Sequence, residues 1–305
     1  MAPSVHWQMS RMPVQFFAHE ASPFGVALSY LRLGRRYLLM YVATWNVNSI
    51  RSRLEQVLAW LGVNPHIDLL CLQETKVEDS KFPVPAFSHC GYQVYIYGQK
   101  SYNGVAMISK QPLEDVKAGF SAVLPKMTGM DAQKRVMSGK LQGVRVVNLY
   151  VPNGAAIASE KYHYKLAWLE CLSQYLAILR QTERYILLCG DFNVALTDLD
   201  IHDPSLSAQQ VMASPAERTA LQQVLGLGFV DIFRQQHPEG GHYSWWDYRG
   251  GSFRRNLGWR IDYHFPSVEL ADRVVSCEID VSPRRNQQPS DHAPVVLGLA
   301  EMPCK

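Results

Sequence analysis

The sequence lacks the features that mark several protein classes. No pair among its six cysteines has CxxC spacing, which argues against a cysteine-based zinc site or a thioredoxin-like redox pair and favours a reducing, intracellular location. No stretch reaches the ~18 consecutive apolar residues of a membrane span, and the nearest candidate, residues 25–41, is interrupted by Arg32, Arg35 and Arg36. We therefore expect a soluble, cytoplasmic protein, associated with the nucleoid in a bacterium, with no membrane partner.

An excess of charge of one sign is also absent. The chain has 30 basic and 27 acidic side chains, and its formal net charge of +3 neither demands nor excludes a nucleic-acid partner. Apolar residues make up 47% of the 305 residues, enough for a large core. No Gly/Ser-rich linker, short repeat or low-complexity tract divides the chain, so one large α/β unit is consistent with its length.

The first residues differ in composition from the rest. Residues 1–39 contain one acid, Glu20, and several arginines, and Met40 directly precedes the first strong strand. We predict a poorly ordered N-terminal extension over residues 1–39 and a single catalytic domain over residues 40–305. An organelle transit peptide, or translation that starts at Met40, are the alternatives.

Apolar periodicity predicts alternating strands and helices. Helices are expected over residues 51–63, 160–180 and 215–225, the last opened by the capping sequence Ser214-Pro215-Ala216-Glu217. Strands are expected over residues 41–46, 69–72, 92–97, 105–109, 144–149, 185–189, 260–265, 274–279 and 295–299. Each half runs strand, helix, strand, which indicates two packed sheets with helices outside and one site along a shared edge.

Polar residues stand at the ends of several predicted strands. Glu74 follows the apolar run 69–72, a suitable place for a Mg²⁺ ligand, and Asn46 ends the first strand in the same way. Taken alone, a capping Glu and a turn Asn explain these two residues as well.

Asp191 and Asn193 flank Phe192 just after a buried strand. Strand alternation places both polar side chains on one side of the chain, where Asp191 can take a proton from water and Asn193 can orient it. An Asx-type turn is the structural alternative.

Asp262 lies inside an apolar strand, where a carboxylate needs a partner. His292 is the natural one, because an Asp–His pair fixes the imidazole tautomer and raises its basicity; Arg260 or Arg255 is the alternative. Asp291 precedes His292, and a turn there would bring both to the rim of the site.

Two aromatic features remain. Tyr150 ends a Val-rich strand before the turn 151–154, where its hydroxyl can donate to a phosphate oxygen unless it is a half-buried core residue. Trp245, Trp246 and Trp259 are interleaved with arginines, a pattern that suits stacking on sugars or bases and equally a Trp-rich core edge.

Taken together, these clusters resemble the exonuclease III family of Mg²⁺-dependent AP endonucleases and 3′-exonucleases, within the endonuclease/exonuclease/phosphatase superfamily. The resemblance covers about residue 40 to the end, and the ordered set of segments is specific although each alone is weak. The matching segments are TWNVNSIRSR (44–53), DLLCLQETKV (68–77), YNGVAMISK (102–110), VVNLYVPNG (146–154), LLCGDFNVALTDLDI (187–201), GFVDIFR (228–234), YSWWDYR (243–249), GWRIDY (258–263) and PSDHAPV (289–295).

The resemblance implies a deoxyribonuclease-I-like four-layer α/β sandwich, with two central mixed sheets flanked by helices. It implies a metal site with Glu74 as the principal ligand. The residues implied around the metal are Asn46, Glu74, Asp191, Asn193, Asp291 and His292.

The same resemblance implies the catalytic roles. Asp191 would activate the attacking water or serve the leaving group, Asn193 would stabilise the transition state, and Tyr150 would contact the scissile phosphate. His292 with Asp262 would form a polar pair that stabilises or deprotonates. Which residue is the general base, and whether one or two metal ions act, stays open.

Substrate contacts are implied as well. Trp245, Trp259 and Ile261 match positions that line a pocket for a flipped-out abasic sugar, while Arg135 and Asn153 match DNA-contacting positions. The Arg260-Ile261-Asp262 segment differs from that of the inositol-phosphate phosphatases, which favours a nuclease.

The expected activity is therefore hydrolysis of double-stranded DNA 5′ to an abasic site by a monomer with Mg²⁺, or Mn²⁺ in its place, together with 3′-to-5′ exonuclease and 3′-end trimming. Two alternatives stay open: another hydrolase of the superfamily acting on a phosphomonoester or an RNA end, and a non-catalytic DNA-binding module.

Overall fold

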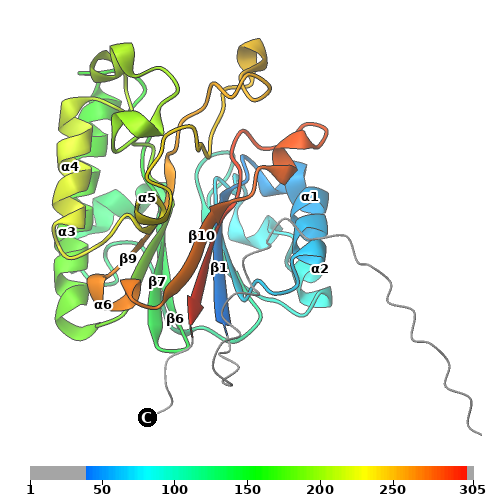
Figure 1. Ribbon diagram of the computed structural model, residues 1–305. Helices are drawn as coiled ribbons and strands as arrows, with labels where there is room; N and C mark the ends of the chain where they lie inside the picture. Colours follow the sequence, from blue (N-terminus) through cyan, green and yellow to red (C-terminus); the bar gives the residue numbers. More distant parts are fainter. Residues whose placement is uncertain (1–38, 301–305) are drawn as a thin grey trace, which may run out of the picture. The chain divides into compact units, whose positions relative to one another are not determined.

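Two β-sheets stand face to face, with helices on their outer sides (Figure 1). The computed structural model describes residues 39–300. The first sheet, ordered β10-β11-β1-β2-β4-β3, contains β1 (Leu39–Asn46), β2 (Leu69–Gln73), β3 (Gln93–Tyr97), β4 (Val105–Ser109), β10 (Val274–Ile279) and β11 (Val295–Ala300). The second sheet, ordered β5-β6-β7-β8-β9, contains β5 (Glu114–Ala118), β6 (Val136–Leu141), β7 (Val144–Tyr150), β8 (Ile186–Asp191) and β9 (Asp262–Pro266).

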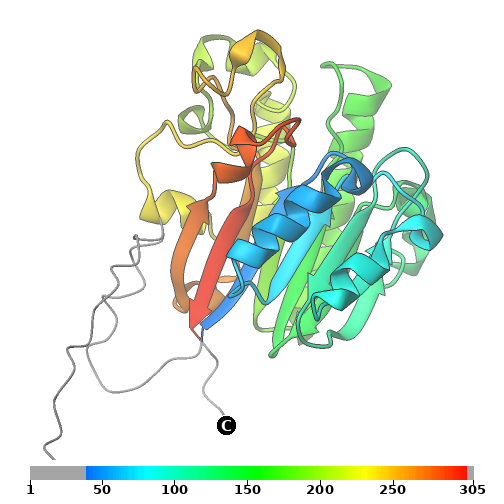
Figure 2. The same cartoon turned by 90° about the vertical axis from the view of Figure 1, so that its right-hand side faces the viewer.

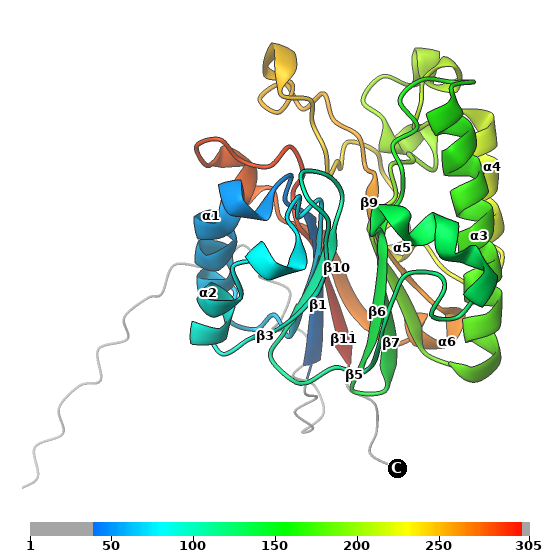
Figure 3. The ribbon, with the colours of Figure 1, turned by 180° about the vertical axis from the view of Figure 1, so that it is seen from behind.

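The helices form the two outer layers. The longer helices are α1 (Ile50–Val63), α3 (Glu160–Thr182) and α4 (Pro215–Leu225), and the shorter ones are α2 (Val84–His89), α5 (Ile232–Gln236) and α6 (Val268–Ala271). Val57 and Leu61 of α1 pack with Leu70 and Leu72 on the outer face of the first sheet. Figure 3 shows α3 and α4 on the other side, where Leu172 packs against the second sheet.

The largest shared core lies between the sheets. Val42 and Leu69 of the first sheet meet Val146 and Leu187 of the second, and all four are fully buried. Burial of this apolar layer stabilises the fold by roughly 25 cal/mol per Å² of apolar surface removed from water. The four-layer sandwich expected from the sequence is confirmed.

Strand direction decides where the polar residues meet. β1 runs parallel to β2, and β7 runs parallel to β8, so each pair ends on the same edge of its sheet. β11 is antiparallel to β1, and the two lie side by side in Figure 2, so the turn that carries His292 reaches the edge where β1 ends. β9 starts opposite the end of β8, with Asp262 facing Asp191. The ends of β1, β2, β7 and β8 thus form one rim.

Most predicted elements occur close to their expected bounds. The predicted cap of α4 is present, because the Ser214 side chain and Glu217 exchange hydrogen bonds with each other's backbone N–H groups. Strands β5 and β6 and helices α2, α5 and α6 were not predicted: the helices are short, β5 is largely exposed, and Ser138, Gly139 and Lys140 interrupt the apolar pattern of β6. The strand predicted over residues 260–265 begins only at Asp262, because the backbone N–H of Arg260 bonds to Asp200 in a loop.

Three further expectations concern the N-terminal extension, membrane-spanning helices and the cysteines. The predicted extension over residues 1–39 lies outside the described residues, except that Leu39 opens β1. Within residues 39–300 no helix combines the length and apolar character needed to cross a bilayer. Cys71 and Cys189 are buried, and the five cysteines of the described region are free thiols.

Candidate active site

Two carboxylates from different sheets share one amide group. The Asn46 Nδ2 donates to Glu74 Oε1 at 3.0 Å and to Asp191 Oδ2 at 2.8 Å. Asn46 ends β1, Glu74 follows β2 and Asp191 ends β8, so the rim predicted from strand ends brings all three together. Asn46 is fully buried, and its Oδ1 also accepts from the Asn48 N–H at 3.0 Å, so it both forms the turn after β1 and joins the two carboxylates.

Glu74 is held in its ionised form. The Tyr150 hydroxyl donates to its Oε1 at 2.7 Å, and Lys76 Nζ lies 2.8 Å from its Oε2. Burial alone would raise the pKa of Glu74, but Lys76 and the hydrogen bonds from Asn46 and Tyr150 together lower it. Glu74 has a positive φ of 50°, a conformation that is uncommon for non-glycine residues and often found at functional sites.

Asp191 and Asn193 lie on one side of the chain while Phe192 is buried in the core, and the Asx turn considered as the alternative is also present, because the Asn193 N–H donates to Asp191 Oδ1 at 2.9 Å. Asn193 Nδ2 donates to Asp191 Oδ2 at 3.1 Å and to the Val151 carbonyl at 2.9 Å. Its Oδ1 accepts from Asn153 Nδ2 at 3.1 Å. Asn193 therefore joins the end of β8 to the turn after Tyr150.

His292 is paired with Asp262, as predicted. Its Nδ1 lies 2.9 Å from Asp262 Oδ2, and its Nε2 lies 3.8 Å from Asp191 Oδ2. The ligand atoms of these three residues all lie within 4.8 Å of one another. The alternative partner, Arg260, is engaged elsewhere, with Asp200 and Asp231.

The protonation of this group follows from its environment. Burial alone would lower the pKa of His292, but the carboxylates of Asp262 and Asp191 outweigh it and raise that pKa to about 10. Burial raises the pKa of Asp191 to about 7, even though the nearby His292 opposes the shift. At neutral pH His292 is thus an imidazolium, and Asp191 is the group closest to exchanging a proton.

Both carboxylate oxygens of Asp291 accept hydrogen bonds. Its Oδ1 accepts from Asn48 Nδ2 at 3.0 Å, and its Oδ2 accepts from Trp245 Nε1 at 3.0 Å. Burial would raise the pKa of Asp291, but His292 and these hydrogen bonds lower it, so the residue is ionised at neutral pH. Asn48 also accepts a hydrogen bond from Lys76, the partner of Glu74, which links Asp291 to the rest of the rim.

An apolar pocket opens beside the polar rim. Trp245, Trp259 and Met212 are among the side chains that line this cavity of about 530 Å³. Ile261, predicted to line the pocket, is not one of its lining residues: it is 1% exposed and packs with Trp259 and Met212 in the apolar cluster behind the wall. The tryptophans thus form a pocket wall, whereas Trp246 is the core residue of the three.

A second cavity lies on the other side of Ala155, which lines both. It has a volume of about 440 Å³, and Arg135, Tyr150 and Asn153 contribute to its wall. Arg135 is 9% exposed, stacks on the Tyr150 ring at 4.4 Å and donates to the Tyr150 carbonyl at 3.1 Å. The predicted substrate-binding residues therefore divide between two neighbouring pockets.

Sequence reasoning missed several residues that hold the site. Ser244 donates to Asp262 Oδ2 at 2.7 Å, Asn48 and Lys76 join Asp291 to Glu74, and Lys165 donates to the Asn193 carbonyl at 2.6 Å. The Asn46-Val47-Asn48 spacing after a strand was a usable signal for Asn48. Lys165 sits in a helix with no local sign of its role.

The donor set fits a hard divalent cation. Glu74, Asp191 and Asp291 offer carboxylate oxygens at one rim, the ligand type preferred by Mg²⁺ and Mn²⁺. The ammonium group of Lys76 already lies against Glu74 and Asn48, which shows that this position attracts positive charge. With an imidazolium and several amide donors nearby, the rim can bind and polarise a phosphate group.

Comparison with known proteins agrees with this chemistry. The model of the "Endonuclease/Exonuclease/phosphatase family" matches residues 43–292. Exodeoxyribonuclease III of Haemophilus influenzae is 34% identical over 268 residues, which cover 84% of this chain and 98% of that protein.

Two solved structures share the fold closely. An AP endonuclease from Archaeoglobus fulgidus is 42% identical with a TM-score of 0.80, and the match covers 86% of this chain and 100% of that one. The 3′ phosphatase NExo from Neisseria, bound to a product DNA hairpin, is 41% identical with a TM-score of 0.81, covering 85% and 98% of the two chains.

Proposed function

This chain belongs to the endonuclease/exonuclease/phosphatase family and is a nuclease of the exonuclease III and AP endonuclease type, and from that premise we propose that it cleaves duplex DNA 5′ to abasic sites with Mg²⁺. The reaction would leave a 3′-hydroxyl. We further propose that the protein acts as a monomer in the cytoplasm, on the nucleoid in a bacterium.

One residue carries the proposal. Trp245 lines the apolar pocket and also donates its indole N–H to Asp291 at 3.0 Å. Its backbone pairs with both Trp259 and His292 as isolated β-bridges. The pocket and the charged rim are thus contiguous, which is the arrangement needed to hold a sugar on one side and its 5′-phosphate on the other.

The pocket walls favour a sugar without a base. Trp259 is 6% exposed, Ile261 is 1% exposed, and Met212 packs against them. An intact nucleotide would also have to give up its stacking and pairing, at a cost of a few kcal/mol that an abasic site largely avoids. The lower cost of flipping out an abasic nucleotide therefore favours this substrate, and the tryptophan walls suit the apolar face of its sugar.

The rim residues would divide the chemistry. Mg²⁺ held by Glu74, with Asn46 and Asp291 beside it, would supply charge neutralisation for the phosphate and the leaving oxygen. The imidazolium of His292 is a fixed donor for a phosphate oxygen, and the Tyr150 hydroxyl, which donates to Glu74 at 2.7 Å, would hold that carboxylate in place.

The role of general base is left to assign, and the environment of Asp191 suits it. With a pKa of about 7 raised by burial, Asp191 accepts a proton from water more readily than His292, which is already protonated. Asn193, bonded to Asp191 Oδ2 at 3.1 Å, fixes the carboxylate in one orientation. We therefore assign the general base to Asp191.

The test uses three labelled duplexes of one sequence: one with a single tetrahydrofuran abasic analogue, one intact and one with a nick that ends in a 3′-phosphate. With Mg²⁺ we expect a single cut 5′ to the analogue, a product extendable by a polymerase, and no cut after chelation. Equal cleavage of the intact duplex would refute abasic-site selection.

Processing of 3′ ends is the second candidate, because the structurally similar NExo is described as a 3′ phosphatase. The same rim would bind a terminal phosphate, while the apolar pocket would be used less. The nicked duplex measures this activity in the same experiment, and the ratio of the two rates ranks the two substrates.

A further inference from the structure

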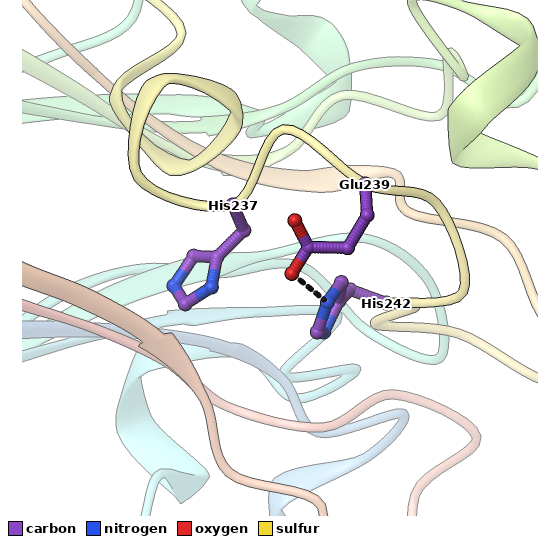
Figure 4. A group of neighbouring side chains, drawn as sticks. All are labelled: His237, Glu239 and His242. Carbon is purple, nitrogen blue, oxygen red and sulfur yellow. Dashed lines mark hydrogen bonds and ion pairs between the residues drawn. The ribbon is translucent and has the colours of Figure 1, made fainter.

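Two histidines and a glutamate converge outside the nuclease site. His237, Glu239 and His242 lie on the segment that follows α5, and their ligand atoms are all within 4.8 Å of one another (Figure 4). Glu239 bonds to His242, while His237 bonds to the Cys277 carbonyl and lies near Glu278 on β10. We propose that this triad, here called the loop triad, is a second metal site that takes a divalent transition ion such as Zn²⁺.

The tautomer of His237 is set for metal binding. Its Nε2 lies 3.1 Å from the Cys277 carbonyl, which can only accept, so Nε2 carries the hydrogen. Glu278 Oε1 lies 3.5 Å from the same nitrogen. In the neutral ring the lone pair is then on Nδ1. A histidine that ligates a metal commonly donates its other N–H to a carbonyl or carboxylate, as this one does.

The packing around the rings fixes their positions. The Phe233 ring stacks on His237 with centroids 4.4 Å apart and meets the edge of His242 at 5.7 Å. Arg234 donates to the backbone carbonyls of His237 and Glu239, so it ties down the loop without occupying the Glu239 carboxylate. Two ligands are therefore positioned before any ion arrives.

The third ligand, Glu239, is accessible from solvent. Glu239 Oε1 lies 3.3 Å from His242 Nε2, and the Glu239 side chain is 64% exposed. Gly240 and Gly241, the latter with φ of 90°, separate Glu239 from His242. These glycines allow the small closure that brings ligand atoms to zinc distances of about 2.0–2.2 Å from a common centre.

The ligand chemistry selects the ion. Two imidazoles and one carboxylate suit Zn²⁺ and neighbouring transition ions, whereas Mg²⁺ prefers an all-oxygen set such as the rim with Glu74. Three protein ligands leave a coordination position for water. Cysteine spacing gave no sign of this site, because it contains no cysteine.

An ion bound by the loop triad would stabilise the segment that leads from His242 to the nuclease site. The segment that follows His242 carries Ser244, which bonds to Asp262, and Trp245, which bonds to Asp291. An ion bound by the loop triad would fasten this segment to β10 through His237. Because the ion binds the folded chain, it should raise the melting temperature.

The experiment measures zinc binding by the full-length protein. Protein stripped with a chelator and returned to excess Mg²⁺, which occupies the nuclease site, is dialysed against ZnCl₂, and bound zinc and melting temperature are recorded. The variants are His242→Ala and Glu239→Gln, with His89→Gln as the matched control because His89 is an exposed histidine at the end of α2.

We expect the wild type and His89→Gln to bind one zinc ion more than His242→Ala, and to show a zinc-dependent rise in melting temperature that His242→Ala lacks. Glu239→Gln should lose most of the affinity, and Glu278→Gln should keep the stoichiometry with affinity lower by about 10-fold. Without zinc, Glu239→Gln and His89→Gln should melt as the wild type does because both side chains are exposed, and the zinc-dependent rise of His242→Ala is measured from its own zinc-free melting temperature because this variant loses the ring contact with Phe233. Equal zinc stoichiometry and affinity in the wild type, His242→Ala and Glu239→Gln would overturn the proposal.

Discussion

Lys165 and Glu217 form an ion pair beneath the nuclease site, with Nζ and Oε1 2.5 Å apart and both side chains fully buried. Lys165 also donates to the carbonyls of Asn193 and Asn153, and Glu217 accepts from the N–H of Met212. One buried pair thus positions a rim residue, a residue of the second cavity and a wall of the apolar pocket.

Lys165→Met should destabilise the fold by about 3–5 kcal/mol, because it leaves the Glu217 carboxylate buried without a counter-ion. Urea unfolding measures the loss. The double variant Lys165→Met with Glu217→Gln should recover much of it, because no net buried charge is left. If the double variant is as unstable as the single one, charge compensation is not the role of this pair.

Trp245→Phe should weaken catalysis while keeping an aromatic pocket wall. The change removes the indole donor to Asp291, and a hydrogen bond to a charged group is worth about 1.5–3 kcal/mol, or about 10- to 100-fold in kcat/KM. Trp246→Phe is the matched control, since its indole donates to Asn256 and not to the rim. Steady-state kinetics on the abasic duplex should separate the two, and equal losses would argue against the Asp291 contact.

Asp191→Asn should lower the cleavage rate by at least about 100-fold, because general-base catalysis usually contributes at least that factor. Binding of the abasic duplex, measured by fluorescence anisotropy, should persist because the amide has nearly the same shape. Asp198→Asn is the control, since Asp198 is exposed and pairs with Arg218. Undiminished cleavage by Asp191→Asn would remove this residue from the mechanism.

Cleavage by the wild type should rise as pH increases through about 7, because Asp191 must lose its proton to act as a base and burial raises its pKa to about 7. The rate should then level off while His292, with a pKa of about 10, stays protonated. A pH profile of kcat/KM measures both the rise through about pH 7 and the plateau above it. A rate that is flat through neutral pH would contradict the assignment of the base.

Stability should depend on pH through His292. Its folded pKa of about 10 lies above the ordinary value of 6.5, so its contribution is fully present below about 6.5 and is lost as pH rises through about 10. Asp262→Asn removes the main partner and should shift this loss to lower pH. Urea unfolding in chelator across this range tests it, and identical pH dependence in the variant would exclude Asp262 as the cause.

Local sequence was sufficient for the longer helices, for most of the strands and for recognising polar residues at the strand ends. The period of the apolar residues predicted α1, β2 and β4, and Ser214 with Glu217 marked the start of α4, because these depend on neighbours within a few residues. Strand-end polar residues such as Glu74 and Asp191 could be recognised because a carboxylate after an apolar run is unusual. The bounds of β9 were predicted less well, since Arg260 is fixed by the distant Asp200.

Which residues pair with each other in the site could be seen only in the folded chain. Which carboxylates share the amide of Asn46, and that Asp262 pairs with His292 and not with Arg260, follow from how β8, β9 and β11 meet across two sheets. The same holds for Lys165, which reaches Asn193 from a helix.

The sequence by itself determined most of the strands, the three longer helices, the resemblance to exonuclease III and the residue types available at the rim, since these depend on local periodicity and motif order. Only the tertiary structure decided that the rim is continuous with the Trp245 pocket, that Arg135 is buried against Tyr150, and that His237, Glu239 and His242 converge. The physical reason is that hydrogen bonding, burial and charge pairing act through space, between atoms whose separation is set by the packing of the two sheets and their loops.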